Sequence, residues 1–141
     1  MEIVSFAKIN LYLEILGKRP DGYHELITLM CCIDLADTLR LQFAPPANRI
    51  TCAHPQVPED DSNLALKAAG HFFHATGTEG HIDISIEKNI PVGAGLGGGS
   101  SNAAAVLQAL NRHHQYPLSA AALMETARKI GADVPFFIEG R

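Results

Sequence analysis

Apolar residues in the first half of the chain recur mostly at every second position, which is the period of a β-strand with one buried face. In residues 10–16, for example, Leu11, Leu13 and Ile15 share one face. The pattern predicts strands at residues 3–6, 10–16, 23–33, 38–43 and 49–53. A Pro-Asp-Gly sequence at residues 20–22 is typical of a tight turn, because proline presets φ and glycine accepts a positive φ.

The second half combines one regular strand with helical segments. Ile82, Ile84 and Ile86 alternate with polar residues, which predicts a half-buried strand over residues 81–89. Helices are expected from about residue 62 to 74, from about 100 to 110 and over 119–130. Their side chains suggest an N-terminal cap at Asp61 or Ser62 for the first, and at Ser100 or Ser101 for the second. Strands first and helices later favour an α+β fold.

The composition is that of one globular domain. Of the 141 residues 47% are hydrophobic and 18% are charged, which is too apolar for a disordered chain. The formal charge of −4 offers no basic surface for nucleic-acid phosphates. The N-terminus lacks a signal-peptide pattern, and the most apolar run, residues 26–33, is too short to span a membrane. We therefore expect a soluble cytoplasmic protein whose three cysteines stay reduced.

The strongest chemical signal is a glycine-rich segment at residues 91–101, between the regular strand and a helix. Five of the seven residues from Gly93 to Gly99 are glycine. Glycines let backbone N–H groups approach a ligand closely, and a helix N-terminus adds unpaired donors and partial positive charge. A plain turn would need only one or two glycines, so the segment predicts a binding site for a di- or triphosphate.

Known nucleotide-binding motifs fit this loop poorly. Gly93, Gly95 and Gly98 have the spacing of a dinucleotide fingerprint, but no strand ending in an acidic residue follows about 20 residues on. A Walker loop would need a lysine after the glycines, and a protein-kinase loop would need a following V-A-I-K strand. A dinucleotide oxidoreductase is therefore disfavoured.

Three further segments carry possible chemistry, and each also has a plain structural explanation. Lys8 and Asn10 lie two apart on one strand and could bind phosphate and substrate, or simply lie at the surface. Asp133 follows a helix and could be a general base or a turn residue. Tyr23 and His24 could stack on a heterocycle, or belong to an ordinary alternating strand.

Together the four segments resemble the GHMP kinase superfamily of small-molecule kinases. The residues that carry the resemblance are 7–11, 19–26, 91–102 and 131–137. The resemblance implies the N-terminal fold of these kinases, which is similar to domain 2 of ribosomal protein S5: a mixed sheet with helices packed on one side. It also implies that residues 1–141 are the N-terminal, ATP-binding domain and that the family's C-terminal domain is absent from this chain.

The resemblance further implies transfer of the γ-phosphoryl of ATP, with Mg²⁺, to a hydroxyl of a small cytidine diphosphate-linked sugar alcohol in isoprenoid precursor synthesis. Lys8 and Asp133 would be catalytic, and Asn10, Tyr23 and His24 would bind the acceptor. The ATP site would comprise Asn63, Lys88, Pro91, Val92, Gly93, Ala94, Gly95, Leu96, Gly97, Gly98, Gly99, Ser100 and Ser101. The metal ligands cannot be assigned from the sequence.

Two alternatives stay open on the sequence. The chain could be another GHMP-type kinase such as homoserine kinase, or a nucleotide-binding domain without catalysis. No nucleic-acid or membrane partner is expected. We also expect an exposed apolar patch at residues 135–138, where a second domain of the family would pack, and self-association through it.

Overall fold

The computed structural model describes residues 1–18, 22 and 24–140. It contains the following elements: β1 (Glu2–Lys18), β2 (His24–Phe43), β3 (Arg49–Cys52), α1 (Leu64–Thr76), β4 (Ile82–Glu87), α2 (Gly98–His113), α3 (Ala120–Ile130) and α4 (Val134–Glu139). The strands form a four-stranded sheet in the order β1-β2-β4-β3. The β1–β2 and β2–β4 pairs are antiparallel and the β3–β4 pair is parallel, so the sheet is mixed, as predicted.

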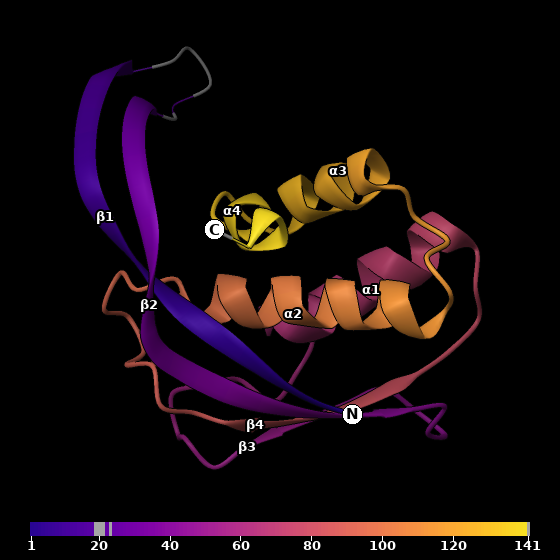
Figure 1. The fold of residues 1–141 in the computed structure, drawn as a ribbon. Coiled ribbons are helices and arrows are strands. Elements are labelled where there is room, and N and C mark those ends of the chain that lie inside the picture. The colour runs from indigo at the N-terminus through magenta and orange to yellow at the C-terminus, as the bar shows by residue number, and fades with distance from the viewer. Residues whose placement is uncertain (19–21, 23, 141) are drawn as a thin grey trace.

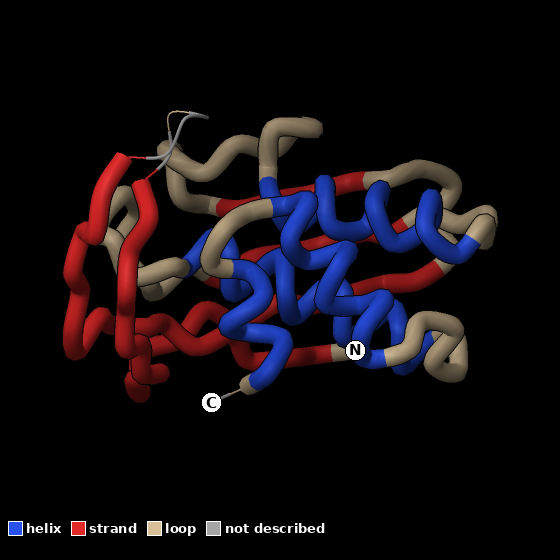
Figure 2. The backbone as a smooth tube through the Cα atoms, turned by 90° about the horizontal axis from the view of Figure 1, so that it is seen from above, coloured by secondary structure: helices blue, strands red, loops and turns tan. Residues whose placement is uncertain are grey.

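The helices cover one face of the sheet in two layers. Figure 1 shows α1 and α2 next to the sheet, with α3 and α4 beyond them, and Figure 2 shows all the helices on the same side of the strands. The core lies between the sheet and the first helical layer, where Leu39 and Ile84 pack with Phe72 and Leu107. Ile82, Ile84 and Ile86 point into this core, which confirms their predicted alternation.

Strands β1 and β2 are each much longer than predicted, because each joins two of the predicted strands. Together they form a hairpin that extends past the sheet. The apolar pattern is interrupted near residues 7–9 and 34–37, but bulges at Phe6/Ala7, Asn10/Tyr12 and Ile15/Gly17 keep β1 paired with β2. The outer part of the hairpin bends toward the helical side of the sheet (Figure 1). The predicted turn at residues 20–22 lies mostly outside the described residues.

Two helix starts differ from the prediction. Asn63, rather than Asp61 or Ser62, caps α1, because its Oδ1 accepts a hydrogen bond from the Ala65 amide at 2.9 Å. Helix α2 begins at Gly98, so Ser100 and Ser101 lie within its first turn and do not cap it. Its cap residue is Gly97, which has no side chain to offer, and this leaves the N–H groups of the first turn available to a ligand.

The short helix α4 was not predicted, because its six residues are too few to show a helical period. It follows Asp133 directly and has proline in its first turn, where a missing N–H is harmless. None of the helices in the described part of the chain is long and apolar enough to cross a membrane.

Candidate functional site

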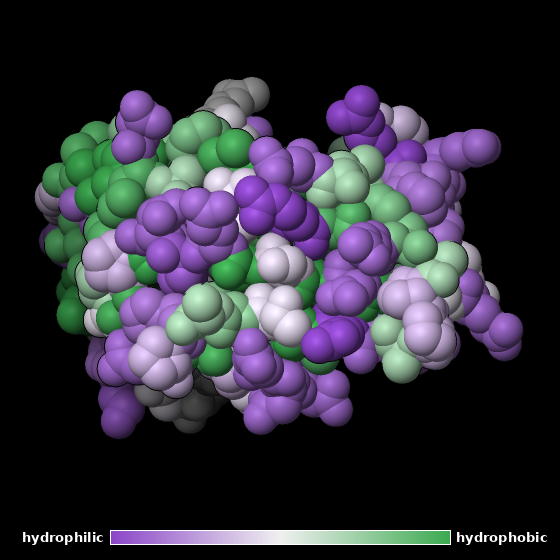
Figure 3. Space-filling model, turned by 90° about the horizontal axis from the view of Figure 1, so that it is seen from below, coloured by the Kyte–Doolittle hydropathy of each residue, from purple (hydrophilic) through white to green (hydrophobic). Residues whose placement is uncertain are grey.

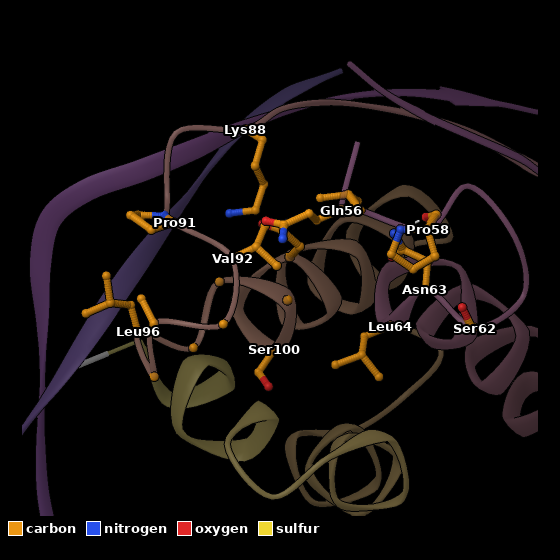
Figure 4. A pocket seen from close by; sticks show the side chains of 18 residues that line it. Gln56, Pro58, Ser62, Asn63, Leu64, Lys88, Pro91, Val92, Leu96 and Ser100 are labelled. Atoms are coloured by element: carbon orange, nitrogen blue, oxygen red, sulfur yellow. Dashed lines mark hydrogen bonds between the residues drawn. The ribbon is translucent and has the colours of Figure 1, made fainter. Parts of the chain in front are cut away.

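The glycine loop connects β4 to α2 and forms one wall of a cavity of about 350 Å³. Gly93, Gly95 and Gly97 have φ values of 73°, 74° and 72°, in the left-handed region that favours glycine. The opposite wall comes from residues 56–58 and 62–64, at the start of α1 (Figure 4). The cavity therefore joins two segments that lie about 30 residues apart in the sequence, as the packing of α1 beside α2 requires.

The N-terminus of α2 lies at this cavity. Gly98, Gly99 and Ser100 line it, and their amides have no intrahelical partner. The helix dipole adds partial positive charge at the same point. Unpaired N–H donors together with this charge are suited to a phosphate group, so the structure places the predicted phosphate loop where it can bind one.

Ser101 differs from the rest of the motif, because it lies behind the loop. Its side chain is buried, and its hydroxyl is 2.7 Å from that of Ser5 on β1. Its amide donates to the Gly97 carbonyl at 2.8 Å. Both polar groups are thus engaged inside the protein, and the structure does not support the expectation that Ser101 binds ATP. Ser100, by contrast, lines the cavity.

Asn63 shapes the cavity wall rather than offering free polar groups to it. Its Oδ1 caps α1, and its Nδ2 donates to the Pro58 carbonyl at 2.8 Å. The side chain is 7% exposed and lines the cavity together with Leu64. Asn63 can still lie beside the nucleotide as expected. It would then contact the nucleotide as part of the cavity wall, because both of its side-chain polar atoms are bonded within the protein.

Lys8, Asn10 and Asp133 come together beside the glycine loop. The Lys8 ammonium donates to Asn10 Oδ1 at 2.6 Å, and its Nζ lies 3.5 Å from Asp133 Oδ2. The Lys8 side chain is 7% exposed and the Asp133 side chain 40% exposed, so the ammonium is buried while the carboxylate reaches solvent. The Lys8 amide also donates to the Leu96 carbonyl at 2.9 Å, which fixes this group against the loop.

Thr28 belongs to the same group, and the sequence analysis missed it. The side-chain Nδ2 of Asn10 donates to Thr28 Oγ1 at 2.6 Å, and the Thr28 hydroxyl donates to the Tyr12 carbonyl at 3.0 Å. Thr28 therefore orients the Asn10 side chain so that its Oδ1 faces Lys8. A lone threonine in a strand has no signal of this role, because only the β1–β2 pairing brings it near Asn10, whose direct partner across the strands is Met30.

Lys88 lines the cavity, but its ammonium is held by the protein itself. Its Nζ lies 3.0 Å from Asp37 Oδ2, and the Lys88 and Asp37 side chains are 7% and 0% exposed. Asp37 was also missed. Its signal was present in the sequence, since Asp37, Leu39 and Leu41 alternate on one strand and place a carboxylate on the buried face.

Of the two expected acceptor-binding residues, the described one, His24, does not line this cavity. His24 begins β2 at the outer end of the hairpin, opposite Lys18, and its side chain is exposed. Tyr23 lies outside the described residues. The structure therefore does not bring His24 to the loop. Asn10, in contrast, bonds the side chain of Lys8, whose backbone contacts the loop.

The expected apolar patch at residues 135–138 is wrong in position. Phe137 is 8% exposed and the rest of the segment is half-buried, because α4 packs on α2 and α3. Exposed apolar side chains gather instead on the outer part of the hairpin, at the end of the molecule where Figure 3 is most hydrophobic. We define the hairpin patch as Leu11, Leu13, Ile15, Leu16, Leu26, Ile27 and Leu29, which are 47–61% exposed.

No metal-binding cluster of three or more His, Cys, Asp or Glu side chains occurs among the described residues. Of the cysteines, Cys32 is partly buried, and this burial raises the pKa of its thiol, with the neighbouring Cys31 adding to the effect. The Cys32 thiol therefore favours its protonated form at neutral pH, which makes it a poor metal ligand and nucleophile.

The comparison with known protein families agrees with this geometry. Residues 63–141 match the family described as GHMP kinases N terminal domain, so the chain belongs to the GHMP kinases. That segment includes the glycine loop, Asp133 and the capping residue of α1.

Curated relatives of this chain include kinases that share one name. The 4-diphosphocytidyl-2-C-methyl-D-erythritol kinases of Gloeobacter violaceus and of Geobacter sp. (strain M21) are each 48% identical to this chain, over 95% and 98% of it. The matched regions are 44% and 50% of those two proteins. The chain thus spans about half the length of the curated relatives it matches.

Solved structures support the fold. The crystal structure of a 4-(cytidine 5'-diphospho)-2C-methyl-D-erythritol kinase matches the whole chain and 50% of its own, with 44% identity and a TM-score of 0.81. A homoserine kinase from Cytophaga hutchinsonii matches 92% of this chain and 40% of its own, with a TM-score of 0.67 but only 20% identity. The second likeness shows a shared fold only, and the α+β GHMP fold expected from the sequence is confirmed.

Glycine at position 97 is required by a close approach as well as by its backbone angle. A Cβ there would lie 2.9 Å from the Phe137 ring and 3.0 Å from Lys8 Cγ, whereas a Cβ at Gly93 would meet nothing within 4 Å. Both positions have a positive φ, so alanine strains the backbone at both. Gly93→Ala is therefore a matched control, because it strains the backbone in the same way but makes no close contact.

We predict that Gly97→Ala lowers the free energy of unfolding by about 1–3 kcal/mol more than Gly93→Ala, because only the first overpacks the contact between the loop, Lys8 and α4. Urea denaturation of the two variants and the unsubstituted protein measures the difference. Equal losses in the two variants would contradict the close packing described here.

Proposed function

We propose that the protein is an ATP-dependent kinase that phosphorylates the 2-hydroxyl of 4-diphosphocytidyl-2-C-methyl-D-erythritol. The observation that carries this proposal is the group Lys8, Asn10 and Asp133 beside a glycine loop with an open helix N-terminus. A cation, a carboxylate and a phosphate cradle are the parts that phosphoryl transfer to an alcohol requires. The names of the relatives support the choice of acceptor.

In this proposal the loop binds the phosphates of ATP. The amides of Gly98, Gly99 and Ser100 would donate to phosphate oxygens, and the α2 dipole would favour their negative charge. Magnesium usually takes most of its ligands from phosphates and water, so it needs few protein ligands. Ser100 lines the cavity, and its hydroxyl would be a suitable protein ligand among them. When bound, the ion would neutralise charge on the transferring phosphoryl group.

The reacting groups have complementary roles. Asp133, with its exposed carboxylate, would accept the proton of the acceptor hydroxyl while that oxygen forms a bond to the γ-phosphorus. The bond between the γ-phosphorus and the bridging oxygen breaks, and ADP leaves. The buried ammonium of Lys8 would stabilise negative charge on the oxygens, and Asn10 holds that ammonium in place.

The acceptor would be recognised outside the cavity described above. We retain Tyr23 and His24 as its cytosine-binding residues, because a ring face and two ring nitrogens can stack on and hydrogen-bond a pyrimidine. Residues 1–141 would then be the nucleotide-binding half of a two-domain kinase, in line with the 44–50% of each relative that the chain matches. A reducing cytoplasm stays the expected compartment.

We expect residues 1–141 alone to turn over substrate poorly, because the second domain would supply one wall of the acceptor site. The direct test is therefore ATP-dependent phosphorylation of 4-diphosphocytidyl-2-C-methyl-D-erythritol by the full-length two-domain protein, followed by ADP release, with homoserine as a comparison acceptor. We expect turnover of the cytidyl substrate only. Phosphorylation of homoserine would favour the other kinase of the same fold, and ATP binding without turnover of either acceptor would favour a non-catalytic nucleotide-binding domain.

Asp133→Asn is nearly isosteric but cannot accept the proton. We predict that it lowers kcat roughly 10²–10⁴-fold with little change in KM, because general-base catalysis acts on the transition state. Glu125→Gln, an exposed carboxylate change on α3, is the control and should leave kcat unchanged. A kcat for Asp133→Asn within about twofold of the original would assign Asp133 a structural role only.

We also propose that residues 1–141 self-associate through the hairpin patch, since contiguous exposed apolar surface drives association. Light scattering should give a mass above that of one chain, and Leu13→Lys with Ile15→Lys should restore the mass of one chain. Tyr116→Lys removes an exposed aromatic at the far end of α2 and should change nothing. A monomeric unsubstituted chain would refute this proposal.

A further inference from the structure

Asp37 is a buried carboxylate at the point where the chain leaves the sheet for the glycine loop. It precedes the paired segment of β2 and β4, which begins with Thr38 opposite Glu87. Its Oδ1 accepts hydrogen bonds from the amides of Asn89 and Ile90, both at 2.8 Å. The Asp37 side chain thus bonds the backbone just past the last paired residue of β4, Glu87, and it fixes the first residues of the loop.

The ammonium of Lys88 is held in the same place. Three oxygen atoms surround its Nζ: Asp37 Oδ1 at 3.2 Å, Asp37 Oδ2 at 3.0 Å and the carbonyl of Ile90. Asp37 Oδ1 and the Ile90 carbonyl accept hydrogen bonds from this ammonium, and Asp37 Oδ2 adds an ion-pair contact without hydrogen-bond geometry. Although Lys88 lines the cavity (Figure 4), its ammonium is held by Asp37 and the Ile90 carbonyl.

Lys88 also touches the far end of the loop. A Cβ on Gly98, the first residue of α2, would lie 3.1 Å from Lys88 Nζ and 3.1 Å from Ile90 Cγ2. The start of the loop at Ile90 and its end at Gly98 therefore meet at the Lys88 ammonium.

A buried ion pair is expensive to desolvate and is weak evidence for stability, so its presence here calls for another explanation. We propose that Asp37 and Lys88 form a positioning pair, which holds the two ends of the glycine loop in register so that the α2 amides converge on the ATP phosphates. The proposal rests on the proposed ATP site. It replaces the expected contact of Lys88 with the nucleotide by an indirect role.

The test is calorimetric titration with the ATP analogue AMP-PNP and Mg²⁺ of Asp37→Asn, Lys88→Met and the double variant. Each single variant should raise the dissociation constant by about tenfold, because each removes the charge-assisted contact between Asp37 and Lys88. The double variant should bind no worse than either single one, since the pair acts as a unit. In kinetics the KM for ATP should rise while the KM for the acceptor stays within about twofold.

Asn111→Ala is the matched control for loss of a buried polar side chain. Asn111 bonds both backbone groups of Leu118 at 3.0 Å, about 20 Å along α2 from Gly98. It should lower the melting temperature and leave AMP-PNP affinity unchanged.

Several results would overturn the positioning role. Unchanged AMP-PNP affinity in the folded Asp37→Asn and Lys88→Met variants would make the pair purely structural. Tighter binding by Asp37→Asn with weaker binding by Lys88→Met would show that the freed ammonium contacts the nucleotide directly. If a single variant fails to fold, the double variant, which leaves no charge unpaired, decides instead. Unchanged AMP-PNP affinity in the double variant would then make the pair purely structural. Absence of AMP-PNP binding by the unsubstituted protein would instead refute the ATP site and the proposed function with it.

Discussion

The hydrogen bond from the Lys8 amide to the Leu96 carbonyl is the contact on which the site depends. It joins an edge strand to the middle of the glycine loop, two segments almost 90 residues apart in the sequence. Once they are joined, the residue after Leu96 has no room for a side chain, and the Phe137 ring closes over it. This brings α4, and Asp133 ahead of it, to the buried ammonium of Lys8. One backbone contact thereby places base, cation and phosphate cradle together.

The hairpin holds the loop at its two ends as well as at its middle. Ser5 and Asp37 face each other across β1 and β2. Asp37 bonds the amides at the start of the loop, and the Ser5 hydroxyl bonds Ser101 and Asn102 in the helix that follows it. The flexible glycines are thus confined between rigid supports, which allows a loop of intrinsically high entropy to present its amides in one arrangement.

Much of this arrangement could be predicted from local sequence, and the rest depends on tertiary contacts. Five glycines before a helix indicate a phosphate loop, and the alternation of Ile82, Ile84 and Ile86 indicates a half-buried strand. The roles of Ser101 and Thr28 could not be predicted, because the orientation of each side chain is set by a hydrogen-bond partner on β1 that lies far away in sequence. The apolar segment of α4 resembles an exposed patch until the packing of α2 and α3 is known.

The most direct test of this account is an experimental structure of the protein with AMP-PNP and Mg²⁺. We expect the terminal phosphate to lie between the first-turn amides of α2 and the ammonium of Lys8, with Asp133 facing the open side of that phosphate. The Asp37–Lys88 pair should remain closed, without contact between Lys88 Nζ and the nucleotide. A triphosphate bound away from residues 93–100, or one that leaves Lys8 and Asp133 on the far side of the adenosine, would contradict the account.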